Sequence, residues 1–514
     1  MNISILALGL TSVFSIWAAA QEAPKVNRVV TQKVVTTLNT FRDGTLTVSP
    51  DGRRFAYAHQ AESGWIVEVD GKDEGTYEDV CVGESPYLVI VFDVFGLMGS
   101  KPMVFSRDNT HFAYSARKRK DWFVVHDGKM GRPFKTVGGP ILSADGHRLA
   151  YRALNDRGWC VVVDGDEGKA YDKVGIPVFS PDGKHLAYAA KASNTEMMVI
   201  DGVEGKAYNN LENYDVGLGL LEKAASKLGY RTAVASRPVF SLDGQLAYVA
   251  KQFARWHIVV DGQESEPFEA VADSMSCLFY SPDGKKLAFS AKKGGIWTFS
   301  VDGRPFGHFP LGISTCVFSP DSQHIAFTVR SGGTESVLVD DRNIGTYGEV
   351  GYLGFSPDSQ RLAFTAKTGG TYSLFVDDRC IGAYNAVGIP VFSPDSIRIA
   401  YAAKSGKTWA LAVDGVLQKS YAGVGNPVFS PDGSHLAYSA ELPYGRCVVV
   451  VDGTEGSPKQ GFVKGARIVF DDSSHFHYLA VESGQVLLIE EEISVNPILR
   501  VLCLRRAYKI SLIE

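Results

Sequence analysis

The sequence lacks the short motifs that identify many enzymes. It contains no Gly-x-Ser-x-Gly, no His-Glu-x-x-His, no Walker loop and no Cys-x-x-Cys. Their absence excludes the nucleophile elbow of α/β-hydrolases, the zinc-binding helix of many metalloproteases, the phosphate-binding loop and the dithiol redox pair. From the sequence we therefore predict no catalytic residue, no metal site and no cofactor.

Cysteine is also scarce, and the charge is nearly balanced. Seven cysteines are scattered over 514 residues, an odd number whose spacing matches no disulfide framework and no metal-binding pattern. The net charge of −5 argues against nucleic acid as a partner. Beyond the first 20 residues no stretch is long and apolar enough to span a bilayer, so we predict no stable membrane insertion after removal of that segment.

The chain begins with an apolar run that ends in Ala18-Ala19-Ala20-Gln21. Such a run followed by small residues is typical of a secretory signal peptide, with cleavage after Ala20. The run departs from this pattern because no Lys or Arg precedes it. An uncleaved anchor is the alternative. We predict a signal peptide over residues 1–20 and a secreted or periplasmic protein.

What the sequence has in abundance is one unit copied along the chain. Residues 388–424 hold four short apolar runs separated by Ser-Pro-Asp-Ser, Lys-Ser-Gly-Lys, Asp-Gly and Gly-Val-Gly. Runs of Val, Ile, Phe, Tyr and Ala between such turns predict β-strands, and none is long enough for a helix. A second marker, Asp-Gly or Asp-Asp, follows the anchor in ten copies. The Ser-x-Asp anchors lie at Ser49, Ser106, Ser143, Ser180, Ser241, Ser281, Ser319, Ser356, Ser393 and Ser430, with a degenerate eleventh after Phe470.

A fixed period of four strands predicts a β-propeller. The predicted fold class is all-β, with four-stranded antiparallel blades in about 10–11 repeats of about 37 residues. Pro177 to Tyr188 and Pro427 to Tyr438 both read Pro-Val-Phe-Ser-Pro-Asp-Gly-x-x-Leu-Ala-Tyr. This motif resembles the WD40-like propeller repeat of TolB, of tricorn-type proteases and of the propeller half of prolyl-oligopeptidase-type enzymes. The resemblance covers about residues 45–490 and implies the fold, whereas the functions of such propellers are unrelated.

The repeats divide the chain into a leader over residues 21–44, a propeller array over 45–492 and a C-terminal tail over 493–514. The last repeat lacks a fourth strand, and we expect the run Lys33–Leu38 of the leader to supply it and close the ring. Insertions at about 81–100 and 209–236 are expected between blades. Four repeats precede the second insertion and seven follow it, so a split into two propellers near 209–236 is the alternative to one ring.

The candidate binding residues recur at two repeat positions. Seven repeats end the predicted second strand with a cation, and six of the seven tryptophans open the predicted third strand. Equivalent positions in a propeller form circles, so we predict a cationic ring with interleaved aromatic side chains on the face that carries the insertions. The alternatives are that the cations are solvated or pair with carboxylates, and that the aromatic rings wedge between blades. The candidates are Arg117, Lys191, Lys251, Lys292, Arg330, Lys367 and Lys404, with Trp122, Trp256, Trp297, Tyr372 and Trp409.

These observations predict an exported, non-enzymatic binding or scaffold protein. Its ligand would be a protein or an anionic polysaccharide that is attracted to the cationic face. The alternative is a propeller enzyme, a lyase or hydrolase of acidic sugars, with its site at the central opening. His111, His185, His324 and His435 share one repeat position, and we predict that they are structural.

Overall fold

The computed structural model describes residues 26–37, 45–80, 103–209, 238–271, 278–309 and 312–494. The predicted signal peptide, both insertions apart from Asn209, and residues 495–514 of the predicted tail lie outside these ranges. Within them, no helix combines the length and the apolar character that a membrane span needs.

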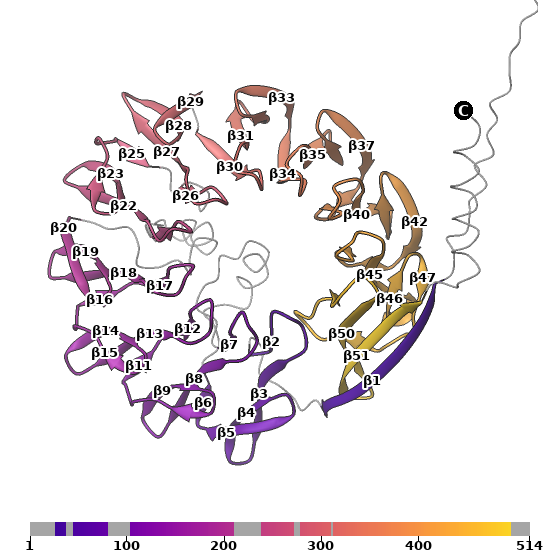
Figure 1. Ribbon diagram of the computed structural model, residues 1–514, viewed down its shortest axis with the longest axis horizontal. Helices are drawn as coiled ribbons and strands as arrows, with labels where there is room; N and C mark the ends of the chain where they lie inside the picture. Colours follow the sequence, from indigo (N-terminus) through magenta and orange to yellow (C-terminus); the bar gives the residue numbers. More distant parts are fainter. Residues whose placement is uncertain are drawn as a thin grey trace, which may run out of the picture.

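Eleven antiparallel sheets follow one another around a single ring (Figure 1). The predicted β-propeller is therefore confirmed, with eleven blades numbered here in chain order. Ala187 of blade 4 and Tyr248 of blade 5 belong to one core cluster. The ring thus continues through the point near 209–236 where a split into four and seven blades was the alternative.

The first strand of each blade lies toward the centre of the ring and the fourth at its rim (Figure 1). The first strands are β2 (Thr47–Val48), β6 (Asp79–Val80) with β7 (Met103–Phe105), β11 (Thr136–Val137) with β12 (Ile141–Leu142), β16 (Lys173–Val174) with β17 (Val178–Phe179), β21 (Val239–Phe240), β25 (Ala270–Val271) with β26 (Leu278–Tyr280), β30 (Ile313–Phe318), β34 (Glu349–Phe355), β38 (Ala386–Val387) with β39 (Val391–Phe392), β43 (Gly423–Val424) with β44 (Val428–Phe429), and β48 (Gly461–Phe462) with β49 (Val469–Phe470). The second strands are β3 (Phe55–Ala61), β8 (Phe112–Lys118), β13 (Leu149–Asn155), β18 (Leu186–Ala192), β22 (Leu246–Gln252), β27 (Leu287–Lys293), β31 (Ile325–Ser331), β35 (Leu362–Thr368), β40 (Ile399–Ser405), β45 (Leu436–Glu441) and β50 (His475–Glu482).

The third and fourth strands complete each sheet toward the rim. The third strands are β4 (Gly64–Val69), β9 (Asp121–His126), β14 (Gly158–Val163), β19 (Thr195–Ile200), β23 (Arg255–Val260), β28 (Ile296–Val301), β32 (Thr334–Val339), β36 (Thr371–Val376), β41 (Thr408–Val413), β46 (Cys447–Val451) and β51 (Gln485–Ser494). The fourth strands are β5 (Lys72–Tyr77), β10 (Lys129–Met130), β15 (Asp166–Glu167), β20 (Val203–Tyr208), β24 (Gln263–Glu264), β29 (Arg304–Phe309), β33 (Arg342–Tyr347), β37 (Arg379–Tyr384), β42 (Val416–Tyr421), β47 (Thr454–Glu455) and β1 (Asn27–Thr37). A short 3₁₀ turn, η3 (Pro443–Gly445), interrupts blade 10.

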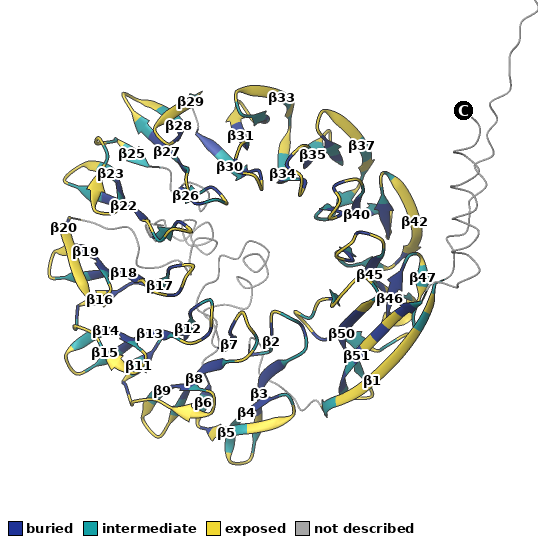
Figure 2. Cartoon of the chain, viewed as in Figure 1, coloured by how far each residue is buried: buried dark blue, intermediate teal, exposed yellow. Residues whose placement is uncertain are grey.

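The core lies between the blades, because both faces of each second strand are buried (Figure 2). Leu186 and Tyr188 of blade 4 share a cluster with Ala150 and Val161 of blade 3. The alternate residue Ala187 faces blade 5 instead. Large side chains on one face thus meet small ones on the next blade, as close packing requires. The fourth strands are exposed on the outside of the ring. In β42, for example, every residue except Tyr421 is exposed.

The ring is closed by pairing the two ends of the described chain. β1 runs antiparallel to β51 from Asn27 opposite Ser494 to Thr37 opposite Gln485, so it is the fourth strand of blade 11. Arg28 lies in this strand and donates hydrogen bonds of 2.6 and 2.8 Å to Glu491, with both side chains almost wholly buried. The strand covers the edge of β51 and becomes the outer strand of the last blade, like the fourth strands of the other blades.

The first insertion interrupts a strand instead of joining two blades. β6 precedes it and β7 follows it, and both pair with β8. The prediction that this insertion lies between blades is therefore wrong. Asn209 marks the same point in blade 5, because its side chain accepts the Phe253 amide just as Asn385 accepts the Gly406 amide in blade 9. The first insertion therefore branches from the innermost strand of blade 2, whereas the second lies outside the described residues beyond Asn209.

Candidate functional site

The two ends of each blade form two faces of the ring. We call the face with the second-to-third-strand hairpins the hairpin face. The face with the Ser-x-Asp and Asp-Gly turns is the turn face. Successive strands are antiparallel, so all eleven hairpins lie on the first face and both kinds of turn lie on the second.

The repeated polar residues of the turn face hold the backbone together. In blade 4 the Ser180 hydroxyl donates to Asp182 at 2.6 Å and accepts the His185 amide at 2.9 Å. The hydrogen bond from Ser180 lowers the pKa of Asp182 to about 2. The marker Asp201 accepts the Leu186 amide at 2.8 Å and has a positive φ, which a two-residue Asp-Gly hairpin requires. These contacts explain the repetition without a ligand.

The predicted histidines of this position bond to the marker aspartates. Nδ1 lies 2.7 Å from the carboxylate in His185–Asp201, 2.9 Å in His324–Asp340 and 2.6 Å in His435–Asp452. Arg148 takes the same role in blade 3, where its Nε donates to Asp164 at 3.1 Å. Because histidine and arginine make the same contact, this position holds the turn in these blades. That these histidines are only structural stays a prediction.

The seven predicted cations occupy one position on the hairpin face. Each is the sixth residue of its second strand, next to the hairpin, and each lies opposite the residue five positions later on the third strand. The pairs are Arg117–Trp122, Lys191–Glu196, Lys251–Trp256, Lys292–Trp297, Arg330–Glu335, Lys367–Tyr372 and Lys404–Trp409.

Three of the cations have carboxylate partners. Lys191 lies 3.6 Å from Glu196, and Arg330 lies 2.7 Å from Glu335. Arg117 lies 3.6 Å from Asp79 of β6. The alternative of pairing with nearby carboxylates therefore holds for these three side chains.

Four of the seven cations lie over aromatic rings, and one of them is Arg117, which lies 5.8 Å from the Trp122 ring centroid. Lys251 lies 4.7 Å from the Trp256 ring centroid, Lys367 lies 5.0 Å from that of Tyr372, and Lys404 lies 5.7 Å from that of Trp409. Lys292 lies directly opposite Trp297 in the sheet. The hydrogen bond to Tyr372 raises the pKa of Lys367, so this amine stays charged.

The aromatic side chains divide into two groups. Trp65, Trp122, Trp159 and Trp256 are half-buried and pack against core clusters, so they serve blade packing. Trp297, Tyr372 and Trp409 are half-buried beside their lysines. The pairs Lys292–Trp297, Lys367–Tyr372 and Lys404–Trp409 on blades 6, 8 and 9 therefore form what we call the cation–aromatic arc. Among the described residues, no carboxylate forms an ion pair with these three lysines.

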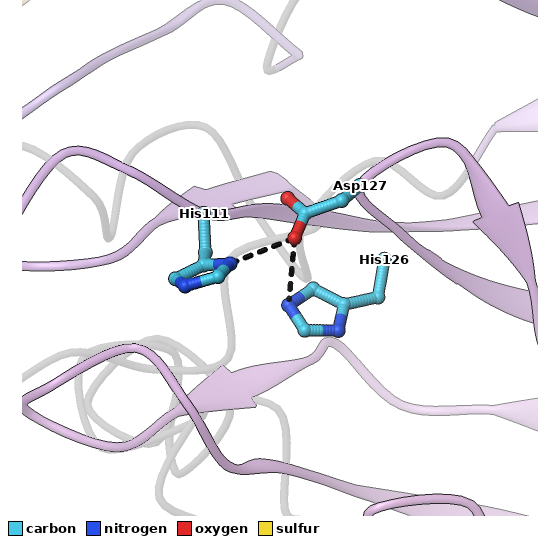
Figure 3. A group of neighbouring side chains, drawn as sticks. All are labelled: His111, His126 and Asp127. Atoms are coloured by element: carbon cyan, nitrogen blue, oxygen red, sulfur yellow. Dashed lines mark hydrogen bonds and ion pairs between the residues drawn. The ribbon is translucent and has the colours of Figure 1, made fainter.

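One further cluster lies on the turn face of blade 2 and was missed from the sequence. His111 Nδ1 lies 2.7 Å from Asp127 Oδ2, and His126 Nε2 lies 3.6 Å from the same oxygen (Figure 3). Burial lowers the pKa of His126. Burial of Asp127 opposes its ionisation, yet hydrogen bonds from His111 and the Phe112 amide lower its pKa below the usual value. The sequence does contain a sign of this cluster. Nine of the ten marker aspartates follow Val or Ile, and only Asp127 follows His.

A second departure from the repeat lies in blade 1. His59 and Glu68 are both buried, with Nε2 and a carboxylate oxygen 3.6 Å apart. The Tyr57 hydroxyl donates to Glu68 at 2.7 Å, and Tyr57 packs against Leu479 of blade 11. This polar group therefore belongs to the junction of the first and last blades.

Comparison with known proteins assigns this chain to no family. No family model matches the chain, and no curated protein matches it. A crystal structure of a eukaryotic initiation factor is similar at 13% identity, over 66% of this chain and 92% of that one, with a TM-score of 0.37. The Dos1 propeller is similar at 12% identity over 74% and 94%, with a TM-score of 0.31. TolB from Acinetobacter baumannii is similar at 15% identity over 62% and 79%, with a TM-score of 0.22. The propeller assignment rests on the eleven sheets, and membership of the WD40-like family stays a prediction.

Proposed function

We propose that this chain is an exported, non-enzymatic binding scaffold whose cation–aromatic arc holds an acidic polysaccharide. The observation that carries this proposal is the set of three lysines, each beside an aromatic ring and none in an ion pair within the described residues. The apolar run of residues 1–20 supports a location outside the cytoplasm.

The spacing of the arc favours a polymer. The three lysines take the same strand position on blades 6, 8 and 9, so the positive charges repeat along a curve. An acidic polysaccharide repeats its carboxylates along a chain and can contact several lysines at once, which raises its affinity above that of one site. An aromatic ring beside each lysine offers an apolar edge to a sugar ring.

The test replaces Lys292, Lys367 and Lys404 by Glu and measures retention on immobilised polygalacturonate across a salt gradient. Each reversal at a partly exposed site changes binding by about 0.5 to 1 kcal/mol. Three reversals should therefore weaken binding by at least about tenfold. The wild-type protein should be retained at low salt and released as salt screens the charges.

The matched control makes the same charge change on the turn face. Lys285, Arg342 and Arg379 are exposed there, and their replacement by Glu should leave retention unchanged. Equal loss in both triple variants would show a response to net charge alone and reject the arc as the site. Retention of the wild type on poly-glutamate but not on polygalacturonate would identify an acidic polypeptide as the partner.

A further inference from the structure

The residues around Asp127 in blade 2 differ from their equivalents in the other blades at one position, the residue before the marker aspartate. Blades 4, 7 and 10 carry the same His–Asp pair, and there the residue before the aspartate is Ile200, Val339 or Val451. In blade 2 this residue is His126, the last residue of β9. The scaffold pair is complete without it, so the additional imidazole needs another explanation.

One nitrogen of the additional imidazole has no hydrogen-bond partner among the described residues. The Nε2 atom of His126 is buried, and it forms no hydrogen bond with any described residue. Buried polar atoms are normally paired, and an unpaired one commonly marks an absent water or ion. The nitrogen faces Asp127 Oδ2 across 3.6 Å (Figure 3), which is too long for a hydrogen bond.

That separation fits two ligands of one cation. Ligand atoms about 2.0–2.1 Å from a tetrahedral zinc ion lie roughly 3.3 Å apart. The ligand atoms of His111, His126 and Asp127 all lie within 4.8 Å of one another. Asp127 Oδ1 accepts the Phe112 amide at 2.9 Å, so Oδ2 is the oxygen turned toward both imidazoles.

We propose that His111, His126 and Asp127 form a binding site for one divalent transition-metal cation, with zinc as the representative ion. Two imidazoles and one carboxylate are ligands that suit zinc and its neighbours better than calcium or magnesium. When the cation binds, coordination replaces the hydrogen bond between His111 Nδ1 and Asp127 Oδ2, and the neutral imidazole keeps its one ring proton on the other nitrogen. Three protein ligands leave at least one coordination position for water or a bound anion.

The test uses the full chain without a polyhistidine tag, freed of metal by a chelator and titrated with Zn²⁺ in a calorimeter. The wild type should bind one ion per chain, and Co²⁺ should give a visible d–d absorption band. The variant His126→Val carries the residue type of the other blades and should fold normally, as circular dichroism checks. It should lose both the stoichiometric binding and the cobalt band.

The control variant is His185→Val, which breaks the equivalent pair in blade 4, where the described residues offer no third ligand. It should keep one zinc ion per chain and the same cobalt band. Binding by His126→Val with unchanged affinity would overturn the proposal, as would the absence of binding by the wild type. Equal loss in both variants would also overturn it, since it would show uptake by scattered imidazoles.

Discussion

At the scale of the residue, one repeat position accepts either His or Arg because both can donate to the marker aspartate. His435 and Asp452 form the shortest of the His–Asp pairs at 2.6 Å, and both are partly buried. The hydrogen bond to Asp452 raises the pKa of His435 above its ordinary value. The protonated imidazole therefore favours the folded state.

This pKa shift gives a pH-dependent contribution to stability. A raised folded-state pKa stabilises fully below the unfolded value of about 6.5, and the contribution is lost as pH rises through the folded value. Replacing His435 by Leu should therefore cost more stability at pH 5.5 than at pH 8.5, as urea unfolding measures. Arg148→Leu removes the equivalent contact in blade 3, and its cost should be the same at both pH values because Arg does not titrate there. Parallel losses for the two variants would contradict the prediction.

The residues of the arc were predictable because they recur, and their partners were not. Counting from the anchor serine finds Lys404 and Trp409 separately, but only the register of β40 and β41 shows that they lie opposite each other. The same spacing assigns Arg330 to the predicted cationic ring of side chains. In the structure Arg330 forms an ion pair with Glu335 of its own blade. His126 was not predictable from the repeat, because it stands where the other repeats have Val or Ile.

At the scale of the element, strand boundaries were less predictable than strand existence. The sequence predicts a strand at Lys33–Leu38, whereas β1 spans Asn27–Thr37. Most of its residues are exposed, so no alternation of apolar and polar residues marks its start. The first strands are often broken into pieces of two or three residues, as β6 and β7 are, and such pieces carry no readable period.

The ion pair that anchors β1 offers a test of this element. Arg28→Ala leaves Glu491 buried without its cation, which should cost about 3–5 kcal/mol. Arg53→Ala removes two ion pairs with Asp471 and Glu490 on the same blade, but these are partly exposed and should contribute less than about 1 kcal/mol. Chemical denaturation of both variants measures the difference. Similar losses would show that burial of the Arg28 pair is not what holds the strand.

At the scale of the whole molecule, closure of the ring depends on β1. Removing residues 26–37 exposes the edge of β51 and takes the Arg28 contacts from the core. The thermal midpoint should fall, and the truncated chain should associate at high concentration through the free edge. Differential scanning fluorimetry and light scattering measure these effects. A synthetic peptide of residues 26–37 should restore the midpoint, and an unchanged midpoint after truncation would rule out this role.

Because blade 11 takes strands from both ends, the order of synthesis matters. A nascent chain that has emerged from the ribosome as far as blade 10 is an open arc, with the apolar faces of its first and last sheets exposed to solvent. β1 is synthesised before all eleven blades, yet its partner β51 is the last described strand to appear. We therefore expect the ring to close in one late step, after β51 has been synthesised. The open arc that precedes this step exposes apolar surface and is the form that most needs a chaperone.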